Sequence, residues 1–326
     1  MSVEVLRPGL LTTIQDRGRF GCAMLGVGRA GAMDDVALRL ANALVGNGPD
    51  AAALEVSLVG PRLRFEASTT IALTGAEFVT RIDDAELPMW RPVAVDAGAV
   101  LDIGSARRGA RAYLAIAGGI DAPRTLGSAA TDVNAKLGGR PLREGDRLAC
   151  EPPERRDSTT SSGRSGAWSL DPRPWSDGDG TTPIRLMPGA HFDALDAPSR
   201  AALFEAEFRV GRDSNRVGYR LDGPNDRLRL AFDAPLELVS EPLAAGTLQL
   251  PPGGEPIVLM AEHPTIGGYP RIGQVAAVDL PRLAQRRPGD PVRFAAIDLD
   301  TAQTRYLERE RELTRLIDAI HARLAP

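Results

Sequence analysis

Short apolar runs separated by turn residues recur through both halves of the chain, and this pattern constrains the fold more than any other feature. Runs of this length and spacing are typical of strands in a barrel or sandwich, and they do not suit a βαβ sheet. The chain is therefore predicted to be mainly β with a few helices. The runs are residues 53–59, 70–73, 93–95, 100–103, 112–117, 184–187, 208–210, 236–239, 257–260, 275–278 and 292–295.

A polar segment divides the two series of runs. Residues 151–183 are rich in Ser, Pro, Gly, Asp and Thr, show no periodicity and are too polar to form a core. A chain of 326 residues is long enough for two domains. We therefore predict an N-terminal β-barrel domain at 1–150, a flexible linker at 151–183 and a C-terminal β-barrel domain at 184–299.

The C-terminal segment, residues 300–326, differs in kind. Apolar residues at 313, 317, 320 and 324 follow the spacing of one helix face, and the opposite face is charged. This pattern predicts an amphipathic helix. Its apolar face either packs on the helix's own domain or contacts another protein chain.

A second helix is predicted near the N-terminus. Asp34 can cap it, Val36, Leu40 and Leu44 form its apolar stripe, and Gly46-Asn47 supplies a left-handed stop. Asn42 lies on this helix between apolar neighbours, where a half-buried amide needs hydrogen-bond partners. Upstream, a turn carrying Gln15, Asp16 and Arg19 is expected either to join the two halves or to touch a ligand.

Charge and composition exclude several classes of protein. The formal net charge is −4 and the basic residues are scattered, which argues against nucleic-acid binding. No apolar run approaches the roughly 20 residues of a membrane span, and the first residues lack the apolar core of a signal peptide. We expect a cytoplasmic protein with no membrane partner and no metal site, because its three histidines are scattered.

The single lysine, Lys136, limits which cofactors this chain itself could carry. Its surroundings, NAKLGG, differ from the Ala-Met-Lys-Met of biotin carriers, and no Gly-Lys-Ser/Thr phosphate loop exists. Biotin is therefore expected only on a partner chain. Any phosphate must be held by arginines, backbone amides or a metal.

An ordered series of motifs covers most of the chain. The series resembles the family that includes the 5-oxoprolinase C subunit, allophanate hydrolase subunit 2 and the carboxyltransferase part of urea amidolyase. The resemblance implies two cyclophilin-like β-barrel domains, and weak internal matches between 26–34 and 211–220 are what a duplication would leave. The motifs are QDRGRFG, AALEVSLVGPRLRF, LTGAEF, GARAYLAIAGGI, RVGYRL, GTLQLP, PIVLMAEHPTIGGYP and DLPRLAQRRPGDPVRF.

The segment AEHPTIGGYP is the predicted catalytic site. Glu262 and His263 follow an apolar run, and a carboxylate beside an imidazole can move protons near neutral pH. The glycines of the following turn permit close approach of a ligand. Compared with the family pattern, this chain departs at Glu262, Pro264, Ile266 and Asn215, which bears on substrate identity. The predicted substrate-binding residues of the turn are Thr265, Gly267, Gly268 and Tyr269.

Further candidates come from both halves. Arg216 and Arg220, beside Tyr219, are candidates to clamp a carboxylate or phosphate, and exposed arginines are the alternative. Gln249 matches the family's Gly-x-x-Gln-x-Pro and is the preferred amide ligand. His191 and His321 stand alone and are assigned structural or exposed positions. Asp34, Asn42 and Glu55 are candidate contacts from the first half. The alternatives are a helix cap alone for Asp34 and simple strand alternation for Glu55.

Three functions remain open. The first is the C subunit of an ATP-dependent 5-oxoprolinase, which opens a lactam to glutamate together with subunits A and B and with ATP, as its Mg complex, shared among them. The second is a biotin-dependent carboxyltransferase subunit acting on urea or another amide. The third is a non-enzymatic antagonist of a histidine-kinase inhibitor. In the first, Glu262 and His263 form the acid–base pair, with stabilisation from Arg216 and the amides of Gly267 and Gly268.

Overall fold

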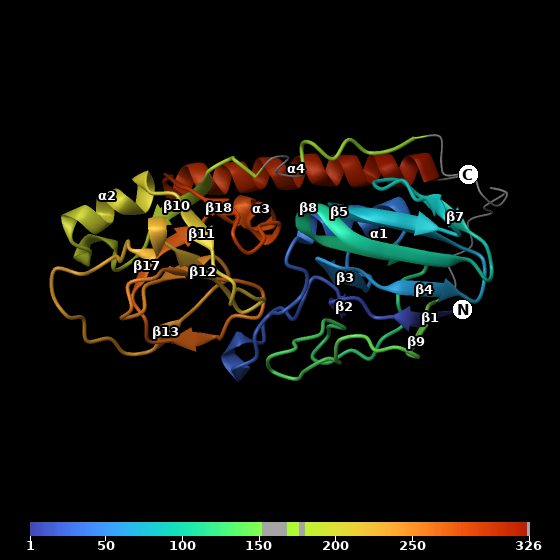
Figure 1. The fold of residues 1–326 in the computed structure, drawn as a ribbon, viewed down its shortest axis with the longest axis horizontal. Helices are drawn as coiled ribbons and strands as arrows, with labels where there is room; N and C mark the ends of the chain where they lie inside the picture. Colours follow the sequence, from blue (N-terminus) through green and yellow to red (C-terminus); the bar gives the residue numbers. More distant parts are fainter. Residues whose placement is uncertain (152–167, 176–179, 325–326) are drawn as a thin grey trace. The chain divides into compact units, whose positions relative to one another are not determined.

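The computed structural model describes residues 1–151, 168–175 and 180–324 (Figure 1). Its contacts divide the chain into two units. Unit 1 comprises Met1–Arg19, Ala30–Ser176 and Glu312–Pro326, and unit 2 comprises Phe20–Arg29 and Asp177–Arg311. The sequence does not anticipate that Phe20–Arg29 groups with unit 2. Most of the predicted linker lies outside the described residues.

Unit 1 is built on one antiparallel sheet of nine strands with the main order β2-β3-β8-β4-β1-β9. Strand β5 extends the sheet by pairing with β6, β7 and β8. The strands are β1 Ser2–Arg7, β2 Leu11–Gln15, β3 Ala53–Ser57, β4 Arg62–Phe65, β5 Thr69–Ile82, β6 Ala85–Glu86, β7 Val93–Val95, β8 Val100–Ile116 and β9 Arg147–Ala149.

The longest strand, β8, corrects the sequence-based prediction. The apolar runs 100–103 and 112–117 predict two strands, whereas the structure has one continuous strand that pairs with β5 along most of its length. Its middle residues, Gly104–Gly109, are partly exposed and largely polar, so they form no apolar run. The β5–β8 ladder nevertheless continues through them by three register shifts.

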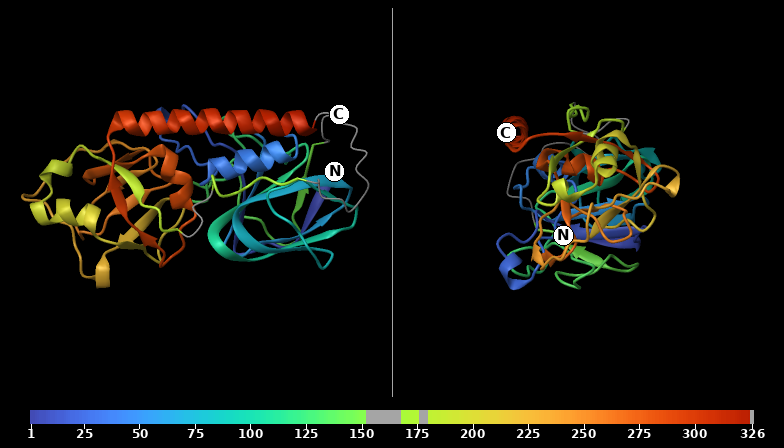
Figure 2. Two further views of the ribbon diagram at one scale, coloured as in Figure 1. Left: turned by 90° about the horizontal axis from the view of Figure 1, so that it is seen from above. Right: turned by 90° about the vertical axis from the view of Figure 1, so that its left-hand side faces the viewer.

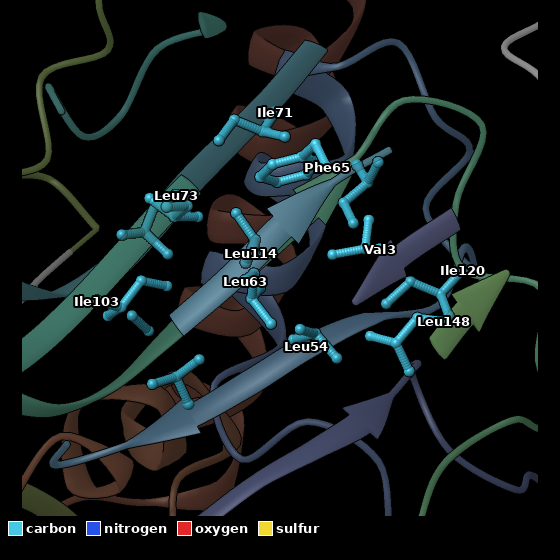
Figure 3. Close-up of a cluster of buried hydrophobic side chains, with 14 of the residues drawn as sticks. Val3, Leu54, Leu63, Phe65, Ile71, Leu73, Ile103, Leu114, Ile120 and Leu148 are labelled. Atoms are coloured by element: carbon cyan, nitrogen blue, oxygen red, sulfur yellow. The ribbon is translucent and has the colours of Figure 1, made fainter. Parts of the chain in front are cut away.

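Alternating residues of these strands form the main core of unit 1 (Figure 3). Val3, Leu54, Leu63, Phe65 and Leu114 are fully buried in it. Their burial follows the period of two that places every second side chain on one face of a strand. The core therefore fixes the register of the strands that carry the polar residues described below.

Helix α1 (Asp35–Leu44) forms where the sequence predicts it. The Asp34 carboxylate accepts a hydrogen bond from the N–H of Ala37 at 3.0 Å, and the chain leaves the helix through Gly46 with φ 75°. One face packs on Ala53 and Tyr113 of the sheet. The other packs on Leu313 and Ile320 of helix α4 (Leu299–Leu324), which lies alongside α1 in Figure 2.

Unit 2 contains an eight-stranded sheet with the order β18-β11-β12-β15-β14-β17-β10-β19, and a two-stranded sheet of β13 and β16. The strands are β10 Ile184–Pro188, β11 Phe208–Val210, β12 Gly218–Asp222, β13 Glu241–Pro242, β14 Thr247–Gln249, β15 Ile257–Leu259, β16 Ile266–Gly267, β17 Arg271–Val275, β18 Pro291–Val292 and β19 Phe294–Ala296.

Helices α2 (Ala197–Glu205) and α3 (Leu280–Ala284) complete unit 2, together with short 3₁₀ turns. The sequence predicts a strand at 236–239, which is wrong. Leu236 and Val239 are exposed, and no ladder covers this stretch. Within the described residues, the 3₁₀ turns are η1 Ala23–Leu25, η2 Phe192–Ala194, η3 Pro224–Asp226 and η4 Ala277–Asp279.

The prediction of a mainly β fold with two barrel-like domains is confirmed, with four α-helices in the described residues. None of those helices is long and apolar enough to span a membrane. Helix α4 is long, but its charged face accounts for that result. The polar residues predicted for the site stand mostly at the ends of strands and around α1.

Candidate functional site

In unit 2 the candidate site begins where β15 ends. Beyond the β12–β15 ladder, the N–H of Met260 donates to the carbonyl of Val217 at 2.9 Å, and the N–H of Glu262 donates to the carbonyl of Arg216 at 2.8 Å. These bonds prolong the pairing past the strand ends. They place the side chains of Arg216 and Glu262 next to each other.

The two side chains form a buried ion pair. Nε of Arg216 donates to Oε1 of Glu262 at 2.5 Å, and the side chains are 4% and 2% exposed. A buried guanidinium of this kind requires a carboxylate partner, because the cost of desolvating a charge is several kcal/mol. Two residues assigned separate roles from the sequence, acid–base and substrate binding, are thus joined.

His263, the next residue along the chain, is also buried. Its Nδ1 lies 2.8 Å from the carbonyl oxygen of Pro264. A carbonyl only accepts, so Nδ1 carries the proton and Nε2 is the proton-accepting nitrogen of the neutral ring. Burial lowers the pKa of His263 below its ordinary value, although the hydrogen bond to the Pro264 carbonyl opposes this effect. The charge of Arg29 adds a smaller lowering, so the neutral ring predominates at pH 7.

The turn after His263 is held by β13. The N–H of Leu243 donates to the carbonyl of Thr265 at 2.9 Å, and Ile266 and Gly267 pair with Pro242 and Glu241. A Cβ on Gly267 would come within 2.7 Å of Leu243 Cδ1, so only glycine fits without a shift. At this turn Ile266 is 60% and Tyr269 48% exposed, which leaves both open to a ligand or partner.

Gln249 lies behind the turn on β14. Its side chain is buried, and Nε2 donates to the carbonyl of Tyr269 at 3.4 Å. The structure therefore brings Gln249 together with Gly267 and Tyr269, and their role in substrate binding stays a prediction. Gly268 is exposed in the same turn.

Tyr219 and Arg220 lie apart from these contacts. The Tyr219 hydroxyl is buried and within 3.4 Å of the carbonyls of Ala284 and Arg286, so it connects β12 to the end of α3. Arg220 is exposed, and its backbone N–H donates to the Ser214 hydroxyl oxygen at 3.1 Å. Their predicted role in substrate binding stays a prediction.

In unit 1, Glu55 is the centre of a buried polar cluster. Its Oε2 accepts from the Tyr113 hydroxyl at 2.7 Å and from the N–H of Met33 at 2.9 Å. The N–H of Asp34 donates to the Tyr113 oxygen at 2.8 Å, and Nε of Arg111 lies 3.7 Å from Glu55 Oε1. Burial first, and then the charge of Glu55, raises the pKa of Tyr113 well above its ordinary value, so its hydroxyl remains a donor.

Asp34 and Asn42 occupy different surroundings. Asp34 joins the Glu55 cluster through its backbone and caps α1 through its side chain. Asn42 is fully buried, donates to the carbonyl of Ala51 at 2.8 Å and accepts from the Asn47 amide at 3.2 Å. Asn42 therefore holds the end of α1 against the following loop.

The hydrogen bonds of the Gln15–Arg19 turn described here are made to other residues of unit 1. The Asp16 carboxylate accepts from the Ser128 hydroxyl at 2.6 Å and from the N–H of Ala129 at 2.8 Å. Gln15 donates to the carbonyl of Thr131 at 2.8 Å, and Arg19 donates to the carbonyl of Thr125 at 3.2 Å. These bonds tie the segment 125–131 to the end of β2.

Two contacts of unit 2 were missed by sequence reasoning. Arg29 acts electrostatically on His263, and its guanidinium lies 4.2 Å from the centre of the Phe20 ring. The sequence feature that could have indicated Arg29 is its position between the glycines of GVGRAG. His191 accepts a hydrogen bond from the N–H of Arg271, just after the turn. Nothing in its local sequence indicates this contact.

The acidic side chains Glu262 and Glu55 are hydrogen-bonded to other side chains of the protein. Among residues 1–151, 168–175 and 180–324, no three His, Cys, Asp or Glu side chains come together as a metal-binding cluster. Glu262 accepts from Arg216 in unit 2, and Glu55 accepts from Tyr113 in unit 1. Within the described residues, both carboxylates are thus engaged by side chains of the protein.

Comparison with known proteins gives consistent matches. Residues 25–296 match the family model described as "Carboxyltransferase domain, subdomain A and B". The chain is 37% identical to the 5-oxoprolinase C subunit of Escherichia coli over 98% of this chain and 99% of that protein. It is 34% identical to the 5-oxoprolinase C subunit of Haemophilus influenzae over 95% of this chain and 96% of that protein.

Larger proteins also match. The chain is 32% identical to urea amidolyase of Saccharomyces cerevisiae over 93% of this chain but only 17% of that protein. The crystal structure of the Kluyveromyces lactis urea carboxylase superposes with a TM-score of 0.83 at 29% identity, over 98% of this chain and 29% of that one. In these proteins the region similar to this chain is one part of a much longer polypeptide.

Proposed function

Because this chain belongs to the family with the carboxyltransferase domain, subdomain A and B, we propose that it acts as the C subunit of an ATP-dependent 5-oxoprolinase. In this proposal it hydrolyses 5-oxo-L-proline to L-glutamate together with partner subunits A and B. The observation that carries the proposal is the end-to-end match to the 5-oxoprolinase C subunit of Escherichia coli. The name of that relative also implies further subunits.

The proposed reaction opens the lactam ring. ATP is a co-substrate that transfers its γ-phosphoryl group to the lactam oxygen and leaves as ADP. Water then attacks the ring carbon and the carbon–nitrogen bond breaks, which leaves a γ-glutamyl phosphate. A second water hydrolyses this acyl phosphate to glutamate and phosphate. His263 Nε2 is the nitrogen proposed to accept the proton of the attacking water and return it to the leaving nitrogen. A neutral imidazole, favoured by the lowered pKa of His263, suits that role at pH 7.

Glu262 and Arg216 serve the same site in a different way. Because Glu262 is ion-paired with Arg216, its carboxylate neutralises the guanidinium and fixes the end of β15. We propose that Glu262, by fixing this segment, keeps His263 in position to transfer protons, so that the two residues act as the acid–base pair. The backbone amides of Gly267 and Gly268 are proposed to stabilise negative charge on the substrate oxygen, and Gln249 supports their turn.

The test is ATP-dependent glutamate release from 5-oxoproline by this chain co-expressed with its partner subunits. We expect release to disappear when this chain is omitted. His263→Gln should lower kcat by about 10²-fold or more, because it removes the proposed base. The matched control is His321→Gln on α4, which should leave the rate unchanged. Full activity of the His263→Gln complex would overturn the catalytic assignment.

A second candidate is a biotin-dependent carboxyltransferase subunit acting on urea or another amide. It is favoured by the description of the family model and by the urea amidolyase match. Biotin would then be attached to a partner chain. Addition of avidin distinguishes the two candidates, because it blocks carboxyl transfer from biotin and leaves a biotin-independent lactam hydrolysis intact. An assembled complex without either activity would favour the non-enzymatic binding role.

A further inference from the structure

The turn that carries Gly267, Gly268 and Tyr269 is fixed at both ends. At its start, the N–H of Leu243 donates to the carbonyl of Thr265 at 2.9 Å. At its end, the N–H of Leu250 donates to the carbonyl of Pro270 at 3.0 Å. Between Leu248 and Gln249 the β14–β17 ladder shifts register, so the chain enters β17 at an irregularity. The orientation of the turn therefore depends on what holds Arg271, the first residue of β17.

His191 makes two hydrogen bonds to the backbone of Arg271. Its Nδ1 accepts a hydrogen bond from the N–H of Arg271 at 3.0 Å, and its own backbone N–H donates to the carbonyl of Arg271 at 3.0 Å. Since a backbone N–H only donates, Nδ1 is the unprotonated nitrogen of the ring. A side chain thus supplies the acceptor of the Arg271 N–H on the edge of β17 that faces His191.

The segment that leads to His191 packs closely against β17. The N–H of Gly189 donates to the carbonyl of Ile272 at 3.1 Å. A Cβ on Gly189 would lie 2.5 Å from the carbonyl oxygen of Arg271, so the backbone approaches β17 closely here. The side chain of Arg271 is in turn ion-paired with Glu241 of β13, whose backbone pairs with Gly267. His191, Arg271 and β13 therefore form one connected support behind the turn.

We propose that His191 is a positioning residue, which sets the orientation of the substrate-binding turn by accepting the hydrogen bond of the Arg271 amide. This inference rests on the proposed function only in that the turn binds substrate. His191 touches neither the reacting atoms nor His263 in this role. Its effect falls on substrate affinity and leaves the chemical step unchanged.

The test compares variants that differ in one acceptor. In His191→Asn the side-chain oxygen takes the place of Nδ1, whereas in His191→Leu no acceptor remains. Amide hydrogen exchange of Arg271, measured by NMR on the full chain, should be about tenfold faster in His191→Leu than in wild type, and close to wild type in His191→Asn. Equal exchange in all three proteins would overturn the proposal.

Kinetics of the assembled complex provide the second readout. In His191→Leu, KM for 5-oxoproline should rise about tenfold with kcat within about twofold, and His191→Asn should restore KM. Faster exchange with unchanged KM would overturn the link to substrate binding. If His191→Leu fails to fold, His191→Gln is used in its place. The Gln side-chain oxygen takes the position of Nε2, so no acceptor stands where Nδ1 accepts the Arg271 N–H. A wild-type complex without glutamate release would refute the proposed function, while the exchange of the Arg271 amide still decides the role of His191.

Discussion

Nε of Arg216 lies 2.5 Å from Oε1 of Glu262, although the two residues stand 46 positions apart in the sequence. Both side chains are buried, so each charge depends on the other. Glu262 directly precedes His263 in the chain, just beyond the end of β15. Loss of the Arg216–Glu262 ion pair should therefore lower the stability of unit 2.

Glu262→Gln should destabilise the protein by about 3–5 kcal/mol, because it removes the carboxylate that balances the buried Arg216 guanidinium. Urea denaturation of the full chain measures this effect as a lower midpoint. The double variant Arg216→Met with Glu262→Leu should recover much of the loss, since it removes both charges together.

The matched control is the exposed pair of Arg229 and Glu255 in the same unit, whose side chains are 42% and 46% exposed. Glu255→Gln should change stability by less than about 1 kcal/mol, because solvent screens this pair. If Glu262→Gln has an effect as small as that of Glu255→Gln, the Arg216–Glu262 pair does not hold the site together.

His263 should make stability depend on pH. Burial, with a further contribution from Arg29, lowers its pKa below the ordinary 6.5. As pH falls, the unfolded chain therefore takes up this proton before the folded chain does. Stability should fall as pH drops from 6.5 through the lower pKa of the folded state, and the difference between wild type and His263→Gln should change over that interval.

Arg29 provides an independent check of this interpretation. Arg29→Gln removes the neighbouring positive charge, so the pKa of His263 should rise towards its ordinary value. NMR titration of the His263 ring in the full chain measures the shift, and Arg212→Gln, an exposed arginine of the same unit, is the control. An unchanged His263 pKa in Arg29→Gln would show that burial alone accounts for the lowering.

The sequence supports some of these conclusions and could not support others. Glu262 and His263 could be placed at a strand end because they follow the apolar run 257–260. The partner of Glu262 could not be identified, because ion pairing between distant residues leaves no periodic signal. Helix α1, in contrast, was predictable because its cap and apolar stripe are local, and they agree with the structure.

Two strand predictions from the sequence are wrong, and each has a physical cause. Strand β8 crosses a polar stretch, and hydrophobic periodicity cannot follow a ladder that continues through backbone bonds alone. The stretch 236–239 carries apolar residues that are exposed, so its composition misleads. The contact of His191 with Arg271 joins residues 80 positions apart, and no local pattern in the sequence indicates it.

Gly267→Ala should weaken substrate binding. The new Cβ would come within 2.7 Å of Leu243 Cδ1 and 3.2 Å of Gln249 Nε2, so the turn must shift. We expect KM for 5-oxoproline to rise about tenfold, in line with the cost of overpacking. Gly48→Ala is the control, because Gly48 lies outside this turn and its Cβ would meet no atom within 4 Å. Adding Leu243→Ala to Gly267→Ala should restore KM, and no recovery would place the defect elsewhere.

Tyr113→Phe tests the cluster of unit 1. Removal of the hydroxyl deprives Glu55 of one donor and the N–H of Asp34 of its acceptor, and both groups are buried. We expect a loss of about 1–3 kcal/mol in the free energy of unfolding. Tyr306→Phe, at a partly exposed position of α4, is the control and should have little effect. Equal stability of Tyr113→Phe and wild type would mean that the start of α1 does not depend on this hydroxyl, and Glu55 would then be better explained by its contact with Arg111.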